Sequence, residues 1–119
     1  MRIIIQSTAH NSIDSLFDYL SNYSIKNAID TIEEIYSRIY NLEFFPYIGR
    51  EIPEIADGRF RELIYRKTRQ STYRIMYYIS KKTNVLYVFE IVNCKQDFYR
   101  ILKLHNYFKN YYNLWIKLH

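Results

Sequence analysis

The spacing of apolar residues changes near Pro46, and this change constrains the fold most strongly. Before Pro46 the apolar residues recur every three or four positions, which is typical of amphipathic helices. After it they alternate with polar residues, which is typical of strands that bury one face. Helical and extended segments are therefore separated along the sequence, and we predict an α+β domain.

Two helices are predicted before Pro46. The apolar face of the first consists of Ala9, Ile13, Leu16, Phe17 and Leu20. Ser7 or Thr8 is expected to cap its N-terminus, and Ser24 is expected to cap the second helix. The apolar stripe of the second consists of Ala28, Ile32, Ile35, Ile39 and Leu42. Because residues 21–24 form only a short link, we predict an antiparallel helical hairpin.

Four strands are predicted around this hairpin. Residues 2–6 contain three consecutive isoleucines, which favour a short buried strand. Residues 60–65, 72–80 and 85–92 follow one another after short connections, which favour an antiparallel meander. We therefore predict a four-stranded, mostly antiparallel sheet in the order β-α-α-β-β-β, with the hairpin packed on one face.

The helical spacing returns from Asp97 to the end of the chain, so we predict a C-terminal helix. The chain is then a single domain over residues 1–119, in which residues 100–119 form a C-terminal helical extension. The sheet face opposite the hairpin is predicted to be open, or partly covered by this last helix.

Charge is divided unevenly between the two halves of the chain. Residues 1–59 hold 5 Lys and Arg against 9 Asp and Glu, whereas residues 60–119 hold 12 against 3. A basic second half favours a polyanion or an acidic partner. The alternative is that these cations only keep edge strands and an exposed helix in solution.

Several classes of protein are excluded by what the sequence lacks. No apolar run approaches the roughly 20 residues of a membrane span, and the start of the chain does not resemble a secretory signal. The single cysteine, Cys94, has no partner for an internal disulfide. The 3 histidines show no metal-ligand spacing, and neither of the 2 glycines lies in a phosphate-binding loop. We therefore expect a cytoplasmic protein without a metal or cofactor.

Four segments resemble the RelE/ParE toxin superfamily, in the order and spacing of that superfamily. Residues 42–50 are similar to its helix-to-loop signature, and residues 60–63 to its arginine–glutamate–leucine strand. Residues 73–79 are similar to its central strand, and residues 91–98 to its closing strand and basic turn. The resemblance implies a growth-inhibiting toxin of a type II toxin–antitoxin module, held inactive by a cognate antitoxin protein.

The resemblance leaves two cellular targets open. The RelE-like branch cleaves messenger RNA on the ribosome without a metal, and the ParE-like branch poisons DNA gyrase. The expected assembly is a homodimer or a toxin–antitoxin hetero-oligomer. A third interpretation is a basic module that binds nucleic acid or a partner and has no toxic activity.

Metal-free RNA cleavage needs a proton acceptor for the 2′-hydroxyl, cations for the phosphate and an acid for the leaving oxygen. Resemblance to the RelE-like branch implies Arg61, Arg74, Lys95 and Tyr99 as the catalytic residues. Arg61 and Arg74 would hold the phosphate charge. Lys95 would bind the RNA backbone or the transition state, and Tyr99 would stack on a base or assist proton transfer.

The RelE-like strand usually carries a further basic residue, and Leu63 occupies its place here. Arg66, Lys67 or Arg69 could replace it in RNA binding, although all three fall in a predicted turn.

Structural roles compete with the catalytic ones. Arg61 could instead pair with Glu62, with Glu90 or with the antitoxin, and Arg74 could be a strand residue that only keeps the open face in solution. The long hairpin and the Arg61-Glu62-Leu63 strand are similar to the ParE-like branch, in which an apolar residue is common at the position of Arg74. The basic second half favours RNA, and on the sequence alone we favour the endoribonuclease.

Overall fold

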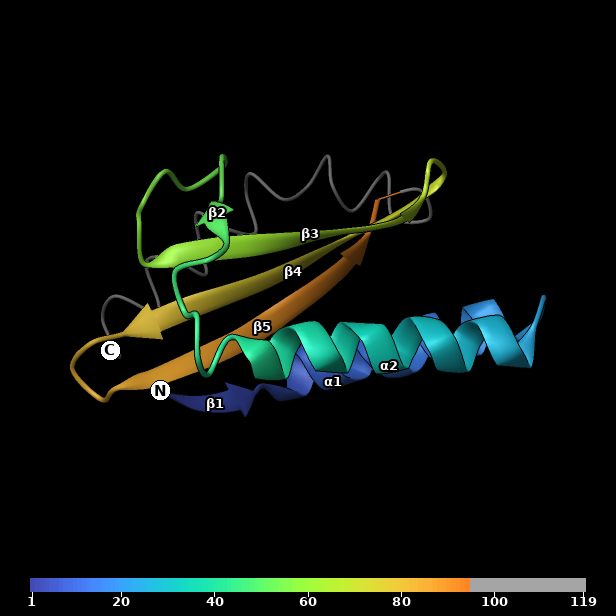
Figure 1. Ribbon diagram of the computed structural model, residues 1–119, viewed down its shortest axis with the longest axis horizontal. Helices are drawn as coiled ribbons and strands as arrows, with labels where there is room; N and C mark the ends of the chain where they lie inside the picture. Colours follow the sequence, from blue (N-terminus) through green and yellow to red (C-terminus); the bar gives the residue numbers. More distant parts are fainter. Residues whose placement is uncertain (95–119) are drawn as a thin grey trace.

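The computed structural model describes residues 1–94, which form two helices and five strands (Figure 1). In chain order these are β1 (Arg2–Ile5), α1 (Ser7–Ser21), α2 (Ile25–Asn41), β2 (Arg50–Glu51), β3 (Phe60–Thr68), β4 (Ser71–Ser80) and β5 (Val85–Asn93). The predicted C-terminal helix and the extension 100–119 lie outside the described residues. Neither described helix is long and apolar enough to cross a membrane.

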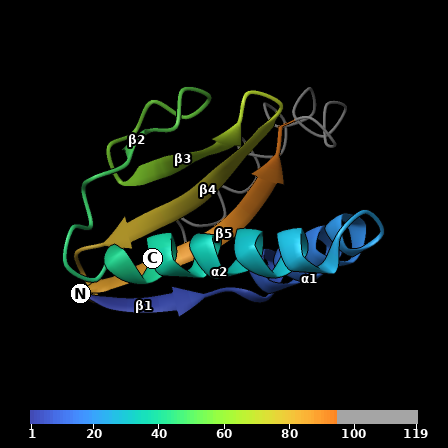
Figure 2. The same ribbon diagram turned by 45° about the vertical axis from the view of Figure 1, so that its right-hand side comes forward.

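The five strands form one mixed sheet in the order β1-β5-β4-β3-β2. β1 runs parallel to β5, and the other neighbouring strands are antiparallel, as the meander predicts. β1 and β2 therefore lie at opposite edges of the sheet (Figure 2). The α+β class and the element order are confirmed. The two-residue strand β2 was not predicted, because only its pairing with β3 distinguishes it from the surrounding loop.

The helical hairpin has one side-chain cap. Ser24 Oγ accepts a hydrogen bond of 3.1 Å from the Asn27 amide, which confirms the predicted cap of α2. The predicted cap of α1 is wrong, because Gln6 occupies the N-cap position and its side chain makes no capping bond. The Thr8 hydroxyl instead donates to the Phe89 carbonyl at 2.7 Å, which ties the start of α1 to β5.

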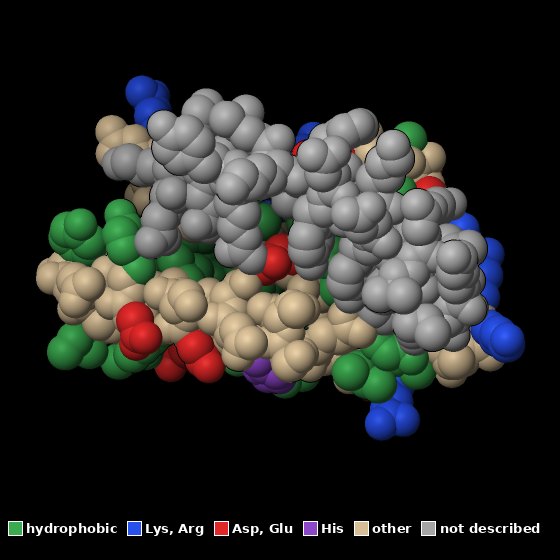
Figure 3. All heavy atoms as spheres, turned by 180° about the vertical axis from the view of Figure 1, so that it is seen from behind, with side chains coloured by type: hydrophobic (Ala, Val, Ile, Leu, Met, Phe, Trp, Pro, Cys, Tyr) green, Lys and Arg blue, Asp and Glu red, His purple; other side chains and the backbone are tan. Residues whose placement is uncertain are grey.

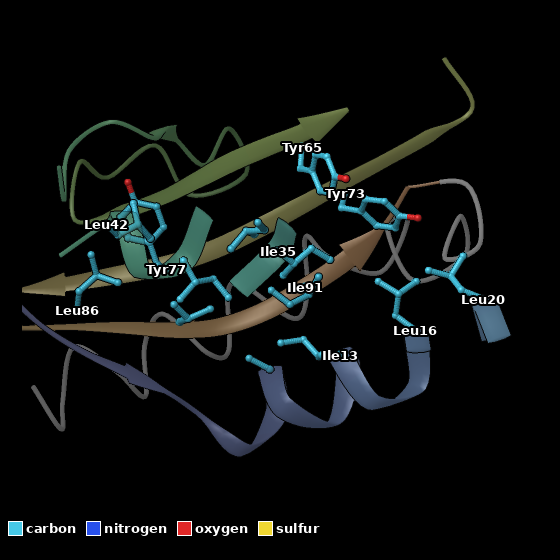
Figure 4. Packing of buried hydrophobic residues seen from close by; sticks show 14 of the residues in the cluster. Ile13, Leu16, Leu20, Ile35, Leu42, Tyr65, Tyr73, Tyr77, Leu86 and Ile91 are labelled. Carbon is cyan, nitrogen blue, oxygen red and sulfur yellow. The ribbon is translucent and has the colours of Figure 1, made fainter. Parts of the chain in front are cut away.

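The main core lies between the hairpin and one face of the sheet (Figure 4). Ile13 and Leu16 of α1 and Ile35 of α2 project toward Tyr73 and other apolar residues of the strands. All of these side chains are buried, and burying each large apolar side chain contributes about 1.5–3 kcal/mol to folding. The helical stripes and the alternation of β4 therefore point inward as predicted.

A second apolar cluster lies on the opposite face of the sheet. It consists of Ile52, Phe60, Met76, Tyr78, Phe89 and Val92, all of them buried. The Phe60 and Tyr78 rings pack at a centroid distance of 4.7 Å. Because these side chains are buried, this part of the face is not open. The other predicted alternative, partial cover by the last helix, falls on residues outside those described. The alternation of β4 predicts which residues point to it but not that they are buried.

Candidate functional site

Alternation along β3 separates two sets of side chains. Leu63 and Tyr65 pack toward the hairpin core. Ile64 and Arg66 line a hollow on the other face, together with Arg74 of β4. The register pairs Ile64 directly with Arg74, so their side chains share one face of the sheet. Ile64, Arg66 and Arg74 therefore lie on the face of the sheet away from the hairpin.

Arg74 is held by two carboxylates. Its Nε donates to Glu62 Oε1 at 2.7 Å. Its Nη1 and Nη2 donate to the two carboxylate oxygens of Glu54 at 3.0 and 2.8 Å, which is a bidentate pair. The Arg74 side chain is only 10% exposed and that of Glu62 is 0% exposed. Each nitrogen of this guanidinium is therefore occupied by a carboxylate.

Glu62 also binds a second arginine, Arg50 of β2. Arg50 Nε donates to Glu62 Oε2 at 2.8 Å, so the two oxygens of Glu62 serve two different guanidinium groups. The side chain of Arg50 is 59% exposed and forms the outer end of the set. We call Arg50, Glu62, Arg74 and Glu54 the arginine–glutamate network. Its two positive and two negative charges balance.

The pKa values of the network reflect this pairing. Burial opposes the charge of Arg74, but hydrogen bonds to Glu54 and Glu62 outweigh it, and the pKa of Arg74 lies above its ordinary value. The hydrogen bonds from Arg74 hold the pKa of Glu54 below its ordinary value. Both groups are therefore charged at neutral pH, and the ion pair stays intact there.

Beside the network the sheet surface forms a hollow of about 440 Å³. It is lined by Arg50, Pro53, Glu54, Ile64, Arg66, Thr72, Arg74 and Cys94. Arg66 is exposed and makes no ion pair within residues 1–94. Because the network is neutral, Arg66 carries the one unbalanced positive charge among the lining residues that the structure describes. The apolar side chains of Pro53 and Ile64, together with Thr72 and Cys94, form the rest of its wall.

Arg61 lies on the other face of the sheet and has a different role. Its Nε donates to the Gly58 carbonyl at 2.8 Å, and its Nη1 donates to the Gly49 carbonyl at 2.7 Å. Its guanidinium carbon lies 5.1 Å from the centre of the Tyr47 ring, a cation–π distance. Arg61 thus joins the loops at 46–49 and 57–58.

The suggested pairing of Arg61 with Glu62 or Glu90 is wrong. Glu62 binds the arginines of the network, and Glu90 accepts a hydrogen bond from Ser12 of α1. Strand alternation places Glu62 and Arg61 on opposite faces, which is why neighbours in sequence do not meet.

The structure does not bring Arg61 and Arg74 together, which are two of the four predicted catalytic residues. Arg61 and Arg74 point to opposite faces of the sheet, so they do not converge on one phosphate. The solvated role suggested for Arg74 is also wrong, because its side chain is buried and paired. Lys95 and Tyr99 lie outside the described residues. No cluster of metal-binding side chains occurs in residues 1–94.

The predicted RNA-binding residues also separate. Arg66 and Lys67 belong to β3 and not to a turn, because this strand extends to Thr68. Arg66 lines the hollow, whereas Lys67 Nζ donates to Thr31 Oγ1 of α2 at 2.7 Å on the hairpin side. Arg69 is exposed in the turn between β3 and β4, as predicted.

Three members of the network were not predicted as functional residues from the sequence, namely Arg50, Glu54 and Glu62. The sequence pattern that could have revealed Glu62 is a carboxylate on the same face of the sheet as an arginine of the neighbouring strand. Seen from behind, Lys and Arg side chains stand mainly at the ends of the molecule, whereas Asp and Glu side chains appear at its lower left, in the middle and at its upper right (Figure 3).

Comparisons with known proteins give one family and one fold. The family model described as "ParE toxin of type II toxin-antitoxin system, parDE" matches residues 3–98. A solved structure titled "Chromosomal ParDE TA system from P. aeruginosa" is similar with a TM-score of 0.59 and 14% identity. The match covers 78% of this chain and 95% of that one, and at this identity it shows the fold alone. No curated protein sequence matches the chain.

Proposed function

The chain belongs to the ParE toxin family of type II toxin–antitoxin systems, and on this premise we propose that it stops growth by poisoning DNA gyrase and not by cutting RNA. The family implies a toxin role and a cognate antitoxin protein as partner. The target is our inference. It departs from the endoribonuclease that the sequence alone favoured.

The state of Arg74 carries this proposal. A metal-free ribonuclease needs cations that are free to neutralise a crowded phosphate in the transition state. Arg74 is already neutralised by Glu54 and Glu62, and a phosphate would have to displace both carboxylates. Arg61 is tied to loop carbonyls on the other face. Neither arginine is arranged to bind a phosphate at a shared site.

The helical hairpin supports a protein target. Its two helices span 15 and 17 residues, and such length resembles the ParE-like branch. At its tip Tyr23 and Ile25 expose 76% and 63% of their area, and Ile29 on the next turn is also exposed. Exposed apolar residues that gather in this way favour contact with another protein.

One observation favours the endoribonuclease as second candidate. Arg66 is exposed in the hollow and makes no ion pair with the described residues, and Cys94 of the same hollow directly precedes Lys95 in sequence. In this alternative Lys95 and Tyr99 supply the chemistry that resemblance to the RelE-like branch implies, and Arg66 binds the RNA backbone. These roles stay predictions.

The test is pulse-labelling of new DNA and new protein after induced expression in cells that lack the antitoxin. We expect DNA synthesis to stop first and the purified chain to inhibit supercoiling by gyrase. An earlier stop in protein synthesis, with messenger RNA cut on ribosomes, would overturn the proposal.

Variants make the same test residue-specific. Lys95→Gln and Tyr99→Phe are expected to keep full toxicity, since gyrase poisoning needs no proton transfer. Arg66→Gln and its matched control Arg69→Gln are expected to behave alike, because the proposal gives neither cation a phosphate to bind. Loss of toxicity in Lys95→Gln and Arg66→Gln, but not in Arg69→Gln, would favour the ribonuclease.

A further inference from the structure

Among residues 1–94, the outer side of β3 has no neighbouring strand beyond its first residues. β2 pairs with β3 only at Arg61 and Glu62. In the described part of the chain, no strand pairs with this side of β3 from Leu63 to Thr68. Such an edge presents unpaired N–H and C=O groups that can accept a strand from another chain.

The direction of these groups follows from the pairing of β2. The Ile52 amide donates to the Phe60 carbonyl at 3.0 Å, so the Phe60 carbonyl points to the outer side. Alternate residues of a strand direct their backbone polar groups to the same side. Ile64 and Arg66 therefore direct their N–H and C=O groups to the free edge, while their side chains line the hollow.

Little protects this edge. Proline is absent from β3, and the Lys67 side chain is drawn to Asn27 and Thr31 of α2, away from the free backbone groups. The register shift between Arg66 and Thr68 ends the regular edge. The accessible positions are thus Ile64 and Arg66, next to the hollow.

The chemistry of the hollow selects the incoming strand. Its single unbalanced charge, on Arg66, matches one carboxylate, and Ile64 and Pro53 offer an apolar wall beside it. A nucleic-acid backbone carries a charge on every nucleotide, and part of that charge would face the carboxylate of Glu54. An extended polypeptide with separate acidic and apolar side chains fits better.

We propose that an extended segment of the antitoxin adds to β3 as an antiparallel strand, in line with β2. An acidic residue lies opposite Arg66, and an apolar residue two positions later in the antitoxin lies opposite Ile64, because alternate side chains share a face. The recognised pattern is acidic-any-apolar. The inference rests on the antitoxin partnership that the family implies and not on gyrase as the target.

The test uses the full chain labelled with ¹⁵N and two synthetic strand-forming peptides that differ only in a central Glu-Thr-Val or Lys-Thr-Val. We expect the Glu peptide to slow amide exchange at Ile64 and Arg66 by about tenfold or more, since an added strand protects these amides. We expect the Lys peptide to have no such effect, because its ammonium group faces Arg66.

Charge reversal supplies the matched control. Arg66→Glu is expected to weaken binding of the Glu peptide by about tenfold, because it places like charges opposite each other. Arg69→Glu makes the same change in net charge three positions away in the turn and is expected to keep binding within about twofold.

Three results would overturn the inference. The first is that neither peptide slows amide exchange at Ile64 and Arg66. The second is that Arg66→Glu and Arg69→Glu bind the Glu peptide equally well. The third is that a single-stranded oligonucleotide, in place of the peptide, protects these amides. Since exchange is measured on the isolated protein, these results do not depend on which cellular process the toxin stops.

Discussion

Arg61 and Arg74 lie on neighbouring strands but point to opposite faces of the sheet. Arg61 is in register with Tyr77 on the hairpin side, and Arg74 is in register with Ile64 on the side of the hollow. Arg61 binds loop carbonyls, whereas Arg74 binds the carboxylates of the network. Substitutions at the two arginines therefore test separate parts of the structure.

Arg74→Ala is expected to lower the free energy of unfolding by about 3–5 kcal/mol. The variant leaves the carboxylate of Glu62 buried with only Arg50 as partner, and breaking a buried ion pair has this order of cost. Urea unfolding measures the loss. Any loss of toxicity in this variant then follows from loss of the fold.

The control for this prediction is Arg66→Ala. Arg66 is exposed and has no ionic partner in residues 1–94, so its removal should change stability by no more than about 0.5 kcal/mol. The double variant Arg74→Met with Glu62→Gln should recover part of the loss, since it removes both buried charges. If the Arg74→Ala protein is as stable as the wild type but is not toxic, Arg74 has a direct role in toxicity.

Gly49→Ala is expected to cost about 1–3 kcal/mol, because the position has no room for a methyl group. An added Cβ would lie 2.5 Å from Tyr77 Oη and 2.7 Å from the Glu62 carbonyl oxygen. It would also disturb the 2.9 Å hydrogen bond that the Gly49 amide donates to Tyr77 Oη. Thermal unfolding gives the measurement.

Gly58→Ala is the matched control for Gly49→Ala. Its added Cβ would meet its nearest neighbour, Glu51 Oε1, at 3.4 Å, which is ordinary contact. We expect a change within about 0.5 kcal/mol. Equal effects of the two substitutions would show that space at Gly49 is not the cause.

The contribution of Glu54 to stability is expected to depend on pH. Hydrogen bonds from Arg74 hold the pKa of folded Glu54 below its ordinary value of 4.5. The unfolded chain therefore binds this proton first, and the contribution is fully present above pH 4.5 and lost as the pH falls through the folded pKa. The stability difference between wild type and Glu54→Gln should shrink across that window.

Unfolding in urea at a series of pH values from neutral to acid tests this prediction. Glu43→Gln makes the same change in net charge at an exposed side chain for which the described residues show no ion pair. Its difference from wild type should stay small throughout. A Glu54→Gln difference that does not vary with pH contradicts the ion-pair explanation.

Ser24→Ala is expected to cost about 1 kcal/mol, since the Ser24 hydroxyl caps the first turn of α2. Ser7→Ala serves as its control, because α1 has no side-chain cap and Ser7 is exposed. That substitution should stay within about 0.5 kcal/mol. Urea unfolding of the two variants compares them, and a larger loss for Ser7→Ala would contradict the assignment of the caps.

The apolar periodicity determined both described helices, the strands β1, β3, β4 and β5, and the inward faces of these elements. Ile13 and Ile35 are buried because apolar residues at helical spacing share a face, a property of the local chain. The cap at Ser24 is local in the same way, because donor and acceptor lie three residues apart. The family resemblance added the toxin role, since its motifs are contiguous segments.

Only the tertiary structure decided the partners of the charged residues. Glu62 and Arg74 are 12 residues apart and Glu54 and Arg74 are 20 apart, so their contact depends on strand register and on the loop before β3. Alternation along β3 made neighbours such as Arg61 and Glu62 face opposite sides. A charged side chain has no local preference that determines its partner, and for this reason the sequence identified Arg74 but not the carboxylates that neutralise it.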